Sequence, residues 1–121
     1  MQSERRGTPR ASKRVIVSLA DASAELVTET TNLSASGAYC TVNRFIAPMT
    51  KLTMRFDLSD GAHPVTIHCT GVVVRTEPSV PTPHHARYSI AVFFSDLAER
   101  DRATITQFVR EHVKLSAGGK S

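Results

Sequence analysis

Apolar and polar residues alternate along most of the chain with the two-residue period of half-buried β-strands. The clearest run is residues 52–58, where Leu52, Met54, Phe56 and Leu58 alternate with polar side chains. Segments rich in Gly, Pro, Asp and Ser separate these runs and are typical of turns. The pattern predicts six strands, over residues 14–19, 25–31, 38–42, 52–58, 65–76 and 87–94, with a bend or bulge at Gly71.

The hydrophobic period changes near the C-terminus. Apolar residues between Ala98 and Val113, among them Ile105, Phe108 and Val109, recur at helical spacing and predict an amphipathic helix over residues 98–114. Residues 115–121 are predicted to form a flexible tail. Short strands followed by one helix that lies on them favour an all-β domain, built as an antiparallel barrel or sandwich.

Positive charge is concentrated at the N-terminus. The chain has 121 residues, which suits one domain, and a net charge of +4. Residues 15–121 hold ten basic and ten acidic side chains, so the first fourteen residues carry the whole excess. Residues 1–13 are polar, without periodicity, and predict a mobile basic arm. Its charge indicates an anionic partner: a nucleotide, a nucleic acid or a membrane surface.

Membrane insertion and catalysis find no support in the sequence. The longest apolar runs, Val72–Val74 and Ile90–Phe94, are far shorter than the roughly 20 residues that span a bilayer. We therefore expect a cytoplasmic protein in which Cys40 and Cys69 are reduced and buried. Catalytic motifs are absent, and the five histidines are scattered. The sequence predicts no enzyme, no metal site and no cofactor.

Two motifs have the residue types of a nucleotide site. Arg6 and Arg10 are four residues apart, and a guanidinium can bind a phosphate or the O6/N7 edge of guanine through two hydrogen bonds. The second motif is Asn32-x-Ser34-x-x-Gly37, predicted to lie in a loop between two strands. An Asn amide can face guanine, and a Ser hydroxyl can donate to a phosphate oxygen. Glycine permits a left-handed backbone and a close approach to a ligand.

In this order the two motifs resemble the signature of the PilZ domain family. The similarity continues through Gly71–Arg75, Tyr88–Phe94 and the Asp101-Arg102 pair, and covers about residues 5–110. The resemblance implies a six-stranded antiparallel β-barrel with a C-terminal helix over residues 14–114. It also implies binding of the bacterial second messenger cyclic di-GMP.

Transferred to this chain, the resemblance assigns a role to each motif residue. Arg6 and Arg10 would hold phosphates and a guanine edge from the arm. Asn32 would read the other guanine edge, Ser34 would approach a phosphate, and Gly37 would leave room for the ligand.

Three further positions modify this expectation. Members of the family hold one ligand or an intercalated pair, and Arg5, a third guanidinium beside the motif, should favour the pair. Asn32 replaces the commoner Asp and offers one acceptor oxygen instead of two, so the guanine contact should be weaker. Ala91 replaces the usual Gly and is expected to crowd the barrel locally, at a point distant in sequence from both motifs.

The expected mechanism is ligand binding by a receptor, with no bond made or broken. The arm would order over the barrel when cyclic di-GMP binds, and a downstream protein would read that change. Two alternatives remain: an adaptor that carries the motifs but acts through protein contacts, and a small β-barrel that binds nucleic acid. The absence of Trp and the neutral charge of residues 15–121 argue against nucleic acid.

Overall fold

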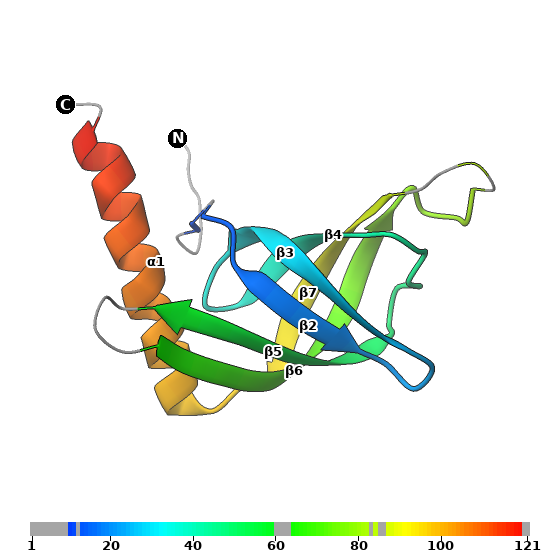
Figure 1. Cartoon of the computed structure of the whole chain (residues 1–121), viewed down its shortest axis with the longest axis horizontal. Coiled ribbons are helices and arrows are strands. Elements are labelled where there is room, and N and C mark those ends of the chain that lie inside the picture. The colour runs from blue at the N-terminus through cyan, green and yellow to red at the C-terminus, as the bar shows by residue number, and fades with distance from the viewer. Residues whose placement is uncertain (1–9, 12, 60–63, 83, 85–86, 120–121) are drawn as a thin grey trace.

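Six antiparallel strands and one helix make up the fold (Figure 1). The computed structural model describes residues 10–11, 13–59, 64–82, 84 and 87–119. The elements are β2 (Ile16–Ala20), β3 (Glu25–Leu33), β4 (Gly37–Val42), β5 (Lys51–Ser59), β6 (Pro64–Glu77), β7 (Tyr88–Asp96) and α1 (Glu99–Gly119). The strands close into a barrel in the order β2-β3-β4-β7-β6-β5. This confirms the all-β barrel that the resemblance implies.

Alternation of apolar side chains fills the barrel interior. Each strand turns every second residue inward, as β5 does with Leu52, Met54, Phe56 and Leu58, all at most 2% exposed. The rings of Phe56 and Phe94 stack across the interior at a centroid distance of 6.0 Å. Because side chains fill the interior, a ligand has to bind on the outer surface or at a rim.

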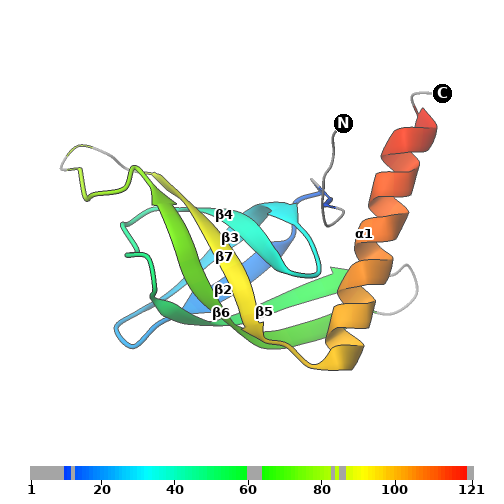
Figure 2. The same ribbon diagram turned by 180° about the vertical axis from the view of Figure 1, so that it is seen from behind.

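Helix α1 lies across one end of the barrel (Figures 1 and 2). Its buried residues Ile105, Phe108 and Val109 are those that the helical spacing predicts. The helix extends to Gly119, whereas the sequence predicts an end at residue 114 and a flexible tail beyond it. Lys, Leu and Ala are good helix formers, and they continue the helix up to the glycine pair 118–119 that ends it. Among the described residues, no helix has the length and apolar character needed to cross a membrane.

Irregular pairing interrupts three of the strands. Beside Gly71, where the sequence predicts a bend or bulge, the register does shift, but the extra residue is Ser95 of β7, since Thr70 pairs with Asp96 and Gly71 with Phe94. A second shift, between Val73 and Arg75, gives β6 an extra residue of its own. In β3 the register shifts between Thr30 and Asn32. A bulge gives one strand an extra residue and turns the following side chains to the opposite face. The second shift in β6 and the shift in β3 are not expected from the sequence.

Candidate functional site

The end of the N-terminal arm is paired with the barrel. Ala11 forms a bridge with Leu33, with N···O distances of 2.8 and 2.9 Å, and is 2% exposed. The sequence predicts a mobile arm through residue 13, but the apolar Ala11 is already part of the packed structure. The bridge fixes Arg10 beside the end of β3. Arg5 and Arg6 lie outside the described residues.

Arg10 and Asn32 lie together although they are 22 residues apart. Nη1 of Arg10 donates a hydrogen bond to Oδ1 of Asn32 at 3.0 Å. The Arg10 guanidinium also lies over the ring of Tyr39, with Cζ 5.1 Å from the centroid. Both contacts orient the guanidinium on the outer surface. The structure therefore brings one residue from each motif into contact.

Asn32 belongs to strand β3, whereas the sequence predicts that it lies in a loop. Thr30 pairs with Cys40 and Asn32 pairs with Tyr39, so Thr31 is the extra residue of a bulge. Thr30 is buried, whereas Thr31 is exposed and Asn32 half-buried. Without the extra residue, strict alternation would turn Asn32 into the core. The bulge is what places this amide on the same face as Tyr39.

Ser34 forms the turn between β3 and β4 and is not in the lining of the hollow beside Arg10. Its backbone N–H donates to the Gly37 carbonyl at 2.9 Å, and its side chain is fully buried. The Oγ atom lies 3.0 Å from Oγ of Ser36 and accepts hydrogen bonds from the N–H groups of Ser36 and Gly37 at 3.2 and 3.3 Å. These contacts commit the Ser34 hydroxyl to the turn, and Ser36 is the residue that faces outward there.

Gly37 is needed for strand packing and not for a left-handed backbone. Its φ angle lies outside the positive range, and it is the first residue of β4. A Cβ atom at this position would lie 2.1 Å from the carbonyl oxygen of Val92 in β7. Glycine is therefore required because β7 passes so close, which differs from the role expected from the sequence.

The turn is held from outside by two further elements. Nη1 of Arg102, in α1, donates to the carbonyl of Ala35 at 2.7 Å. The N–H of Phe94, in β7, donates to the carbonyl of Ser36 at 2.9 Å. Sequence reasoning missed Arg102 as a site residue because its partner is 67 positions away. These bonds connect the motif turn to the C-terminal helix.

A surface hollow of about 330 Å³ adjoins the motif residues. Its lining includes Arg10, Ser36, Gly37, Tyr39, Arg75 and Ala91. Ala91 is distant from both motifs in sequence, but it pairs with Tyr39 and its half-buried side chain lies on the outer face, in the lining of this hollow. Tyr39 could have been identified as outward-facing from the alternation of residues 38–42.

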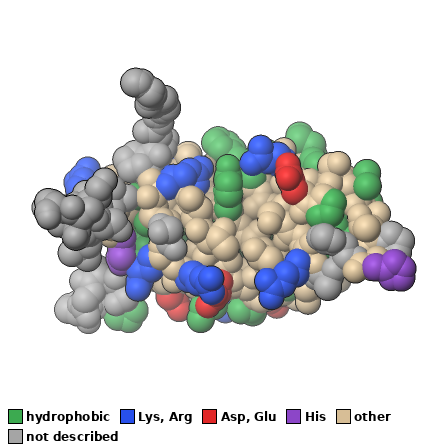
Figure 3. Space-filling model, turned by 90° about the horizontal axis from the view of Figure 1, so that it is seen from above, with side chains coloured by type: hydrophobic (Ala, Val, Ile, Leu, Met, Phe, Trp, Pro, Cys, Tyr) green, Lys and Arg blue, Asp and Glu red, His purple; other side chains and the backbone are tan. Residues whose placement is uncertain are grey.

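Two other hollows lie on the barrel surface. The larger, of about 430 Å³, lies between Arg14 and Arg87 over β3 and β4, and the other, of about 370 Å³, lies beside Lys13 and Arg55. Neither contains a motif residue, so the hollow beside Arg10 is the better candidate. Figure 3 shows Lys and Arg side chains, with apolar side chains between them, over the face that carries β3 and β4.

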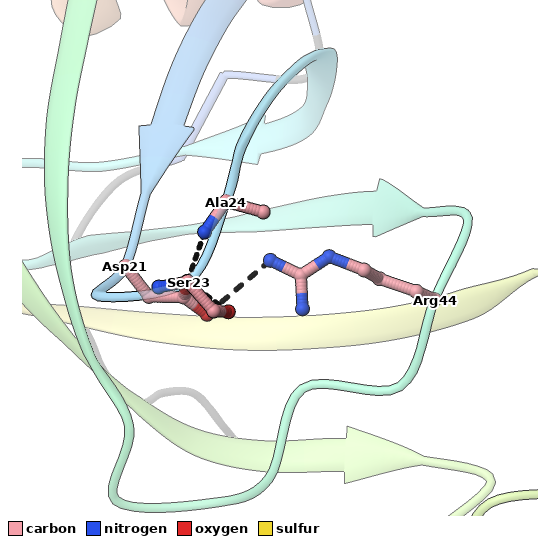
Figure 4. A network of polar contacts seen from close by, with 4 residues as sticks. All are labelled: Asp21, Ser23, Ala24 and Arg44. Atoms are coloured by element: carbon pink, nitrogen blue, oxygen red, sulfur yellow. Dashed lines mark hydrogen bonds and ion pairs between the residues drawn. The ribbon is translucent and has the colours of Figure 1, made fainter.

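The titratable groups with perturbed pKa values are structural. Asp21 closes the turn between β2 and β3, where its carboxylate accepts hydrogen bonds from the N–H groups of Ser23 and Ala24 and pairs with Arg44 at 3.2 Å (Figure 4). The Ser23 bonds foremost hold the Asp21 pKa well below its usual range. Burial raises the pKa of Cys40 to about 12 and that of Cys69 to about 11. Among the described residues, no three His, Cys, Asp or Glu side chains are arranged to hold a metal ion.

The fold and the site define a class of protein: a small closed β-barrel, covered at one end by a helix, with a guanidinium and an amide beside a surface hollow. The sequence matches the PilZ domain over residues 4–111, and the chain belongs to this family. The match confirms the resemblance. No curated protein matches the sequence.

Solved structures with the same fold include two PilZ domains and an inhibitor of motility. Bacillus subtilis MotI/DgrA, an inhibitor of motility, has a TM-score of 0.75 at 21% identity over 93% of this chain and 53% of its own. The chain thus spans about half the length of MotI/DgrA. The PilZ domain of Escherichia coli YcgR with c-di-GMP has a TM-score of 0.66 at 9% identity, covering 97% and 98% of the two chains. The PilZ domain of CeSA from a cellulose-synthesizing bacterium has a TM-score of 0.55 at 18% identity, covering 88% and 97%.

Proposed function

We propose that this protein is a cyclic di-GMP receptor domain of bacterial second-messenger signalling, acting in the cytoplasm. The observation that carries the proposal is the contact between Arg10 and Asn32 beside the hollow over β4, β7 and β6. Membership of the PilZ family supports it, as does the likeness to the YcgR domain solved with c-di-GMP. The function is binding, without a chemical step.

The motif residues divide into those that bind the ligand and those that shape the site. Arg10 offers two N–H donors to a guanine O6/N7 edge or to a phosphate, and Asn32 reads the other guanine edge. Arg5 and Arg6 join them from the arm. Ser34 and Gly37 act mainly by fixing the turn, because the Ser34 hydroxyl reaches a phosphate only if it gives up its bonds within the turn.

The energetics are sufficient for micromolar binding. A dissociation constant of 1 μM corresponds to about 8 kcal/mol, and each hydrogen bond to a charged group contributes about 1.5–3 kcal/mol. Three arginines and Asn32 can supply this, less the cost of ordering the arm. Tyr39 already orients Arg10, which lowers that cost.

The ligand is larger than the hollow and has to extend toward the arm. The volume of about 330 Å³ is at the lower end of ligand sites, which span about 300–1,000 Å³. We propose that the ligand draws residues 1–9 onto the barrel and that a downstream protein recognises the ordered arm. An intercalated pair of ligands would use Arg5 in addition to Arg6 and Arg10.

Isothermal titration with cyclic di-GMP tests the proposal, because it reports affinity and stoichiometry together. Arg10→Ala and Asn32→Ala should each weaken binding, the former by about tenfold or more because it removes charge-assisted bonds. Arg55→Ala is the matched control, since Arg55 is an exposed arginine beside a different hollow. A wild-type protein that shows no binding, or that binds unchanged after Arg10→Ala, would refute the proposal.

The same samples distinguish the other functions. A nucleic-acid binder would bind DNA or RNA with a steep salt dependence and would ignore cyclic di-GMP. An adaptor acting through protein contacts alone would show no response to the nucleotide. An enzyme would convert the messenger, which chromatography of the ligand recovered after titration would reveal.

A further inference from the structure

A bulge in β6 turns Arg75 to the outer surface of the barrel. Val73 pairs with Val92 and Arg75 pairs with Ala91, so Val74 is the extra residue. Val73 and Thr76 are buried, whereas Val74 and Arg75 both face outward. Without the bulge, strict alternation would turn the Arg75 guanidinium into the core. This is the same device that places Asn32 outside in β3.

The two bulges put Asn32 and Arg75 at the ends of one row across four strands. The register pairs Asn32 with Tyr39, Tyr39 with Ala91, and Ala91 with Arg75. Ala91 is the smallest member of the row and forms the floor of the hollow between Tyr39 and Arg75. Nη2 of Arg75 lies 3.5 Å from the Tyr39 hydroxyl. The guanidinium of Arg10 lies over the ring of the same tyrosine, so Tyr39 contacts both arginines.

Arg75 is accessible to a ligand. Its side chain is 60% exposed, and its ion pair with Glu77, whose side chain is 70% exposed, is long, at 4.0 Å. Two apolar side chains border the same hollow, Val74 at 56% and Phe93 at 51% exposure. Flat apolar surface beside a planar guanidinium suits a purine base, whose faces are apolar and whose edges are polar.

We infer that Arg75 binds the second guanine of cyclic di-GMP, on the floor formed by Ala91. This rests on the proposed function, in which Arg10 and Asn32 hold the first guanine. The messenger has two equivalent halves, and the motif residues account for one of them. The remaining half lies along the row toward β6, where Arg75 donates to O6 and N7 of the base. Tyr39 is a positioning residue that stands between the halves and orients both guanidiniums.

The assignment makes Arg75 a specificity residue. Guanine presents two acceptors, O6 and N7, to the guanidinium, whereas adenine presents one acceptor and the N6 donor. A guanidinium has donors only, so it rejects adenine at this position. The protein should therefore bind cyclic di-GMP about tenfold or more tightly than the mixed cyclic GMP–AMP, which places its one guanine on Arg10 and Asn32.

Titrations of both cyclic dinucleotides into wild type and variants test the inference. Arg75→Ala should weaken cyclic di-GMP about tenfold or more and change the affinity for cyclic GMP–AMP little, so that the preference collapses. Arg75→Lys keeps the charge but loses the two-pronged donor, and should also lose the preference. Tyr39→Leu should weaken both ligands, because it removes the ring that orients Arg10. Arg55→Ala is again the control and should leave both affinities unchanged.

The outcomes separate the inference from the proposed function. If Arg10→Ala weakens cyclic di-GMP while Arg75→Ala leaves both affinities unchanged, or lowers both equally, Arg75 does not read the second guanine and only the inference fails. If wild-type protein binds no cyclic di-GMP, both fail. Because the Arg75 side chain is exposed, the variants should retain the wild-type melting temperature, which thermal unfolding checks.

Discussion

Replacement of Gly37 by Ala tests whether the close approach of β4 and β7 holds the motif turn together. The added Cβ would lie 2.1 Å from the Val92 carbonyl oxygen, 3.2 Å from the Val92 carbonyl carbon and 3.3 Å from Cα of Phe93. All three atoms belong to the backbone, so no side chain can rotate away. The strands have to separate by about 1 Å, since real Cβ contacts do not fall below 3.0 Å.

The expected cost follows from this displacement. Overpacking of a tight site costs about 1–3 kcal/mol, and each backbone hydrogen bond that is weakened between the strands adds about 0.5–1.5 kcal/mol. We expect Gly37→Ala to lower the free energy of unfolding by about 2–4 kcal/mol. With an m-value of about 2 kcal/mol/M in urea, the midpoint should fall by about 1–2 M. Cyclic di-GMP affinity should fall as well, because Gly37 accepts the Ser34 bond that closes the turn.

Gly71→Ala is the matched control in the same assay. Its Cβ would meet two side-chain atoms, Cγ1 of Val92 at 2.5 Å and Sδ of Met54 at 2.8 Å, while the nearest backbone atom, the carbonyl oxygen of Phe93, is 3.3 Å away. A methionine adapts its shape easily, so this substitution should cost less, about 1–2 kcal/mol. A Gly37→Ala midpoint equal to that of wild type, or a smaller loss than for Gly71→Ala, would contradict the reasoning.

Three further predictions concern groups outside the hollow. Cys40 and Cys69 should react with a maleimide at pH 8 only after unfolding, because burial raises both thiol pKa values. Mass spectrometry of native and urea-unfolded samples measures the labelling, and rapid labelling of the native protein would contradict the prediction. The free energy of unfolding of the wild type should exceed that of Asp21→Asn most at pH 7, and the difference should shrink as the pH falls below about 4. The reason is that the lowered pKa keeps Asp21 charged to lower pH in the folded protein than in the unfolded chain. Urea midpoints of both proteins from pH 7 to 3 measure the difference, and a difference that grows in acid would contradict the prediction. Arg102→Ala should lower the free energy of unfolding by about 1–2 kcal/mol, because the Ala35 carbonyl loses its hydrogen-bond donor. The affinity for cyclic di-GMP should fall several-fold, and an unchanged affinity would show that α1 does not support the turn.

The strands and the helix follow from local patterns in the sequence. A period of two identifies every strand, since one face of each strand is buried in the barrel. Gly71 marks one position where the pairing is irregular, although the extra residue there is Ser95 of the partner strand β7. The other two bulges have no such marker: they arise where Thr31 and Val74 are added to strands whose partners set the register. The positions of these two bulges depend on pairing between strands that are distant in sequence, and the local pattern of apolar residues holds no information on that pairing.

The site was predictable only in part for the same reason. The family resemblance singles out Arg10, Asn32, Ser34 and Gly37, and the structure joins Arg10 to Asn32. The resemblance alone does not reveal that the Ser34 hydroxyl is buried in its own turn. Residues 39, 75 and 91 enter the site because two pairings, between β4 and β7 and between β7 and β6, align them.

The placement of the site on the outer face explains how binding could reach a partner. A filled barrel transmits little motion through its core, because close-packed side chains leave it rigid. The motif turn, by contrast, follows directly on the end of β3, where Asn32 contacts Arg10 of the arm, and it is bonded to α1 through Arg102. A ligand that draws on Arg10 therefore acts on a turn whose far side is held by the helix. Arg10 of the arm and helix α1 thus both lie at this turn, so that under the proposed function a downstream protein that contacts either of them would sense the ligand.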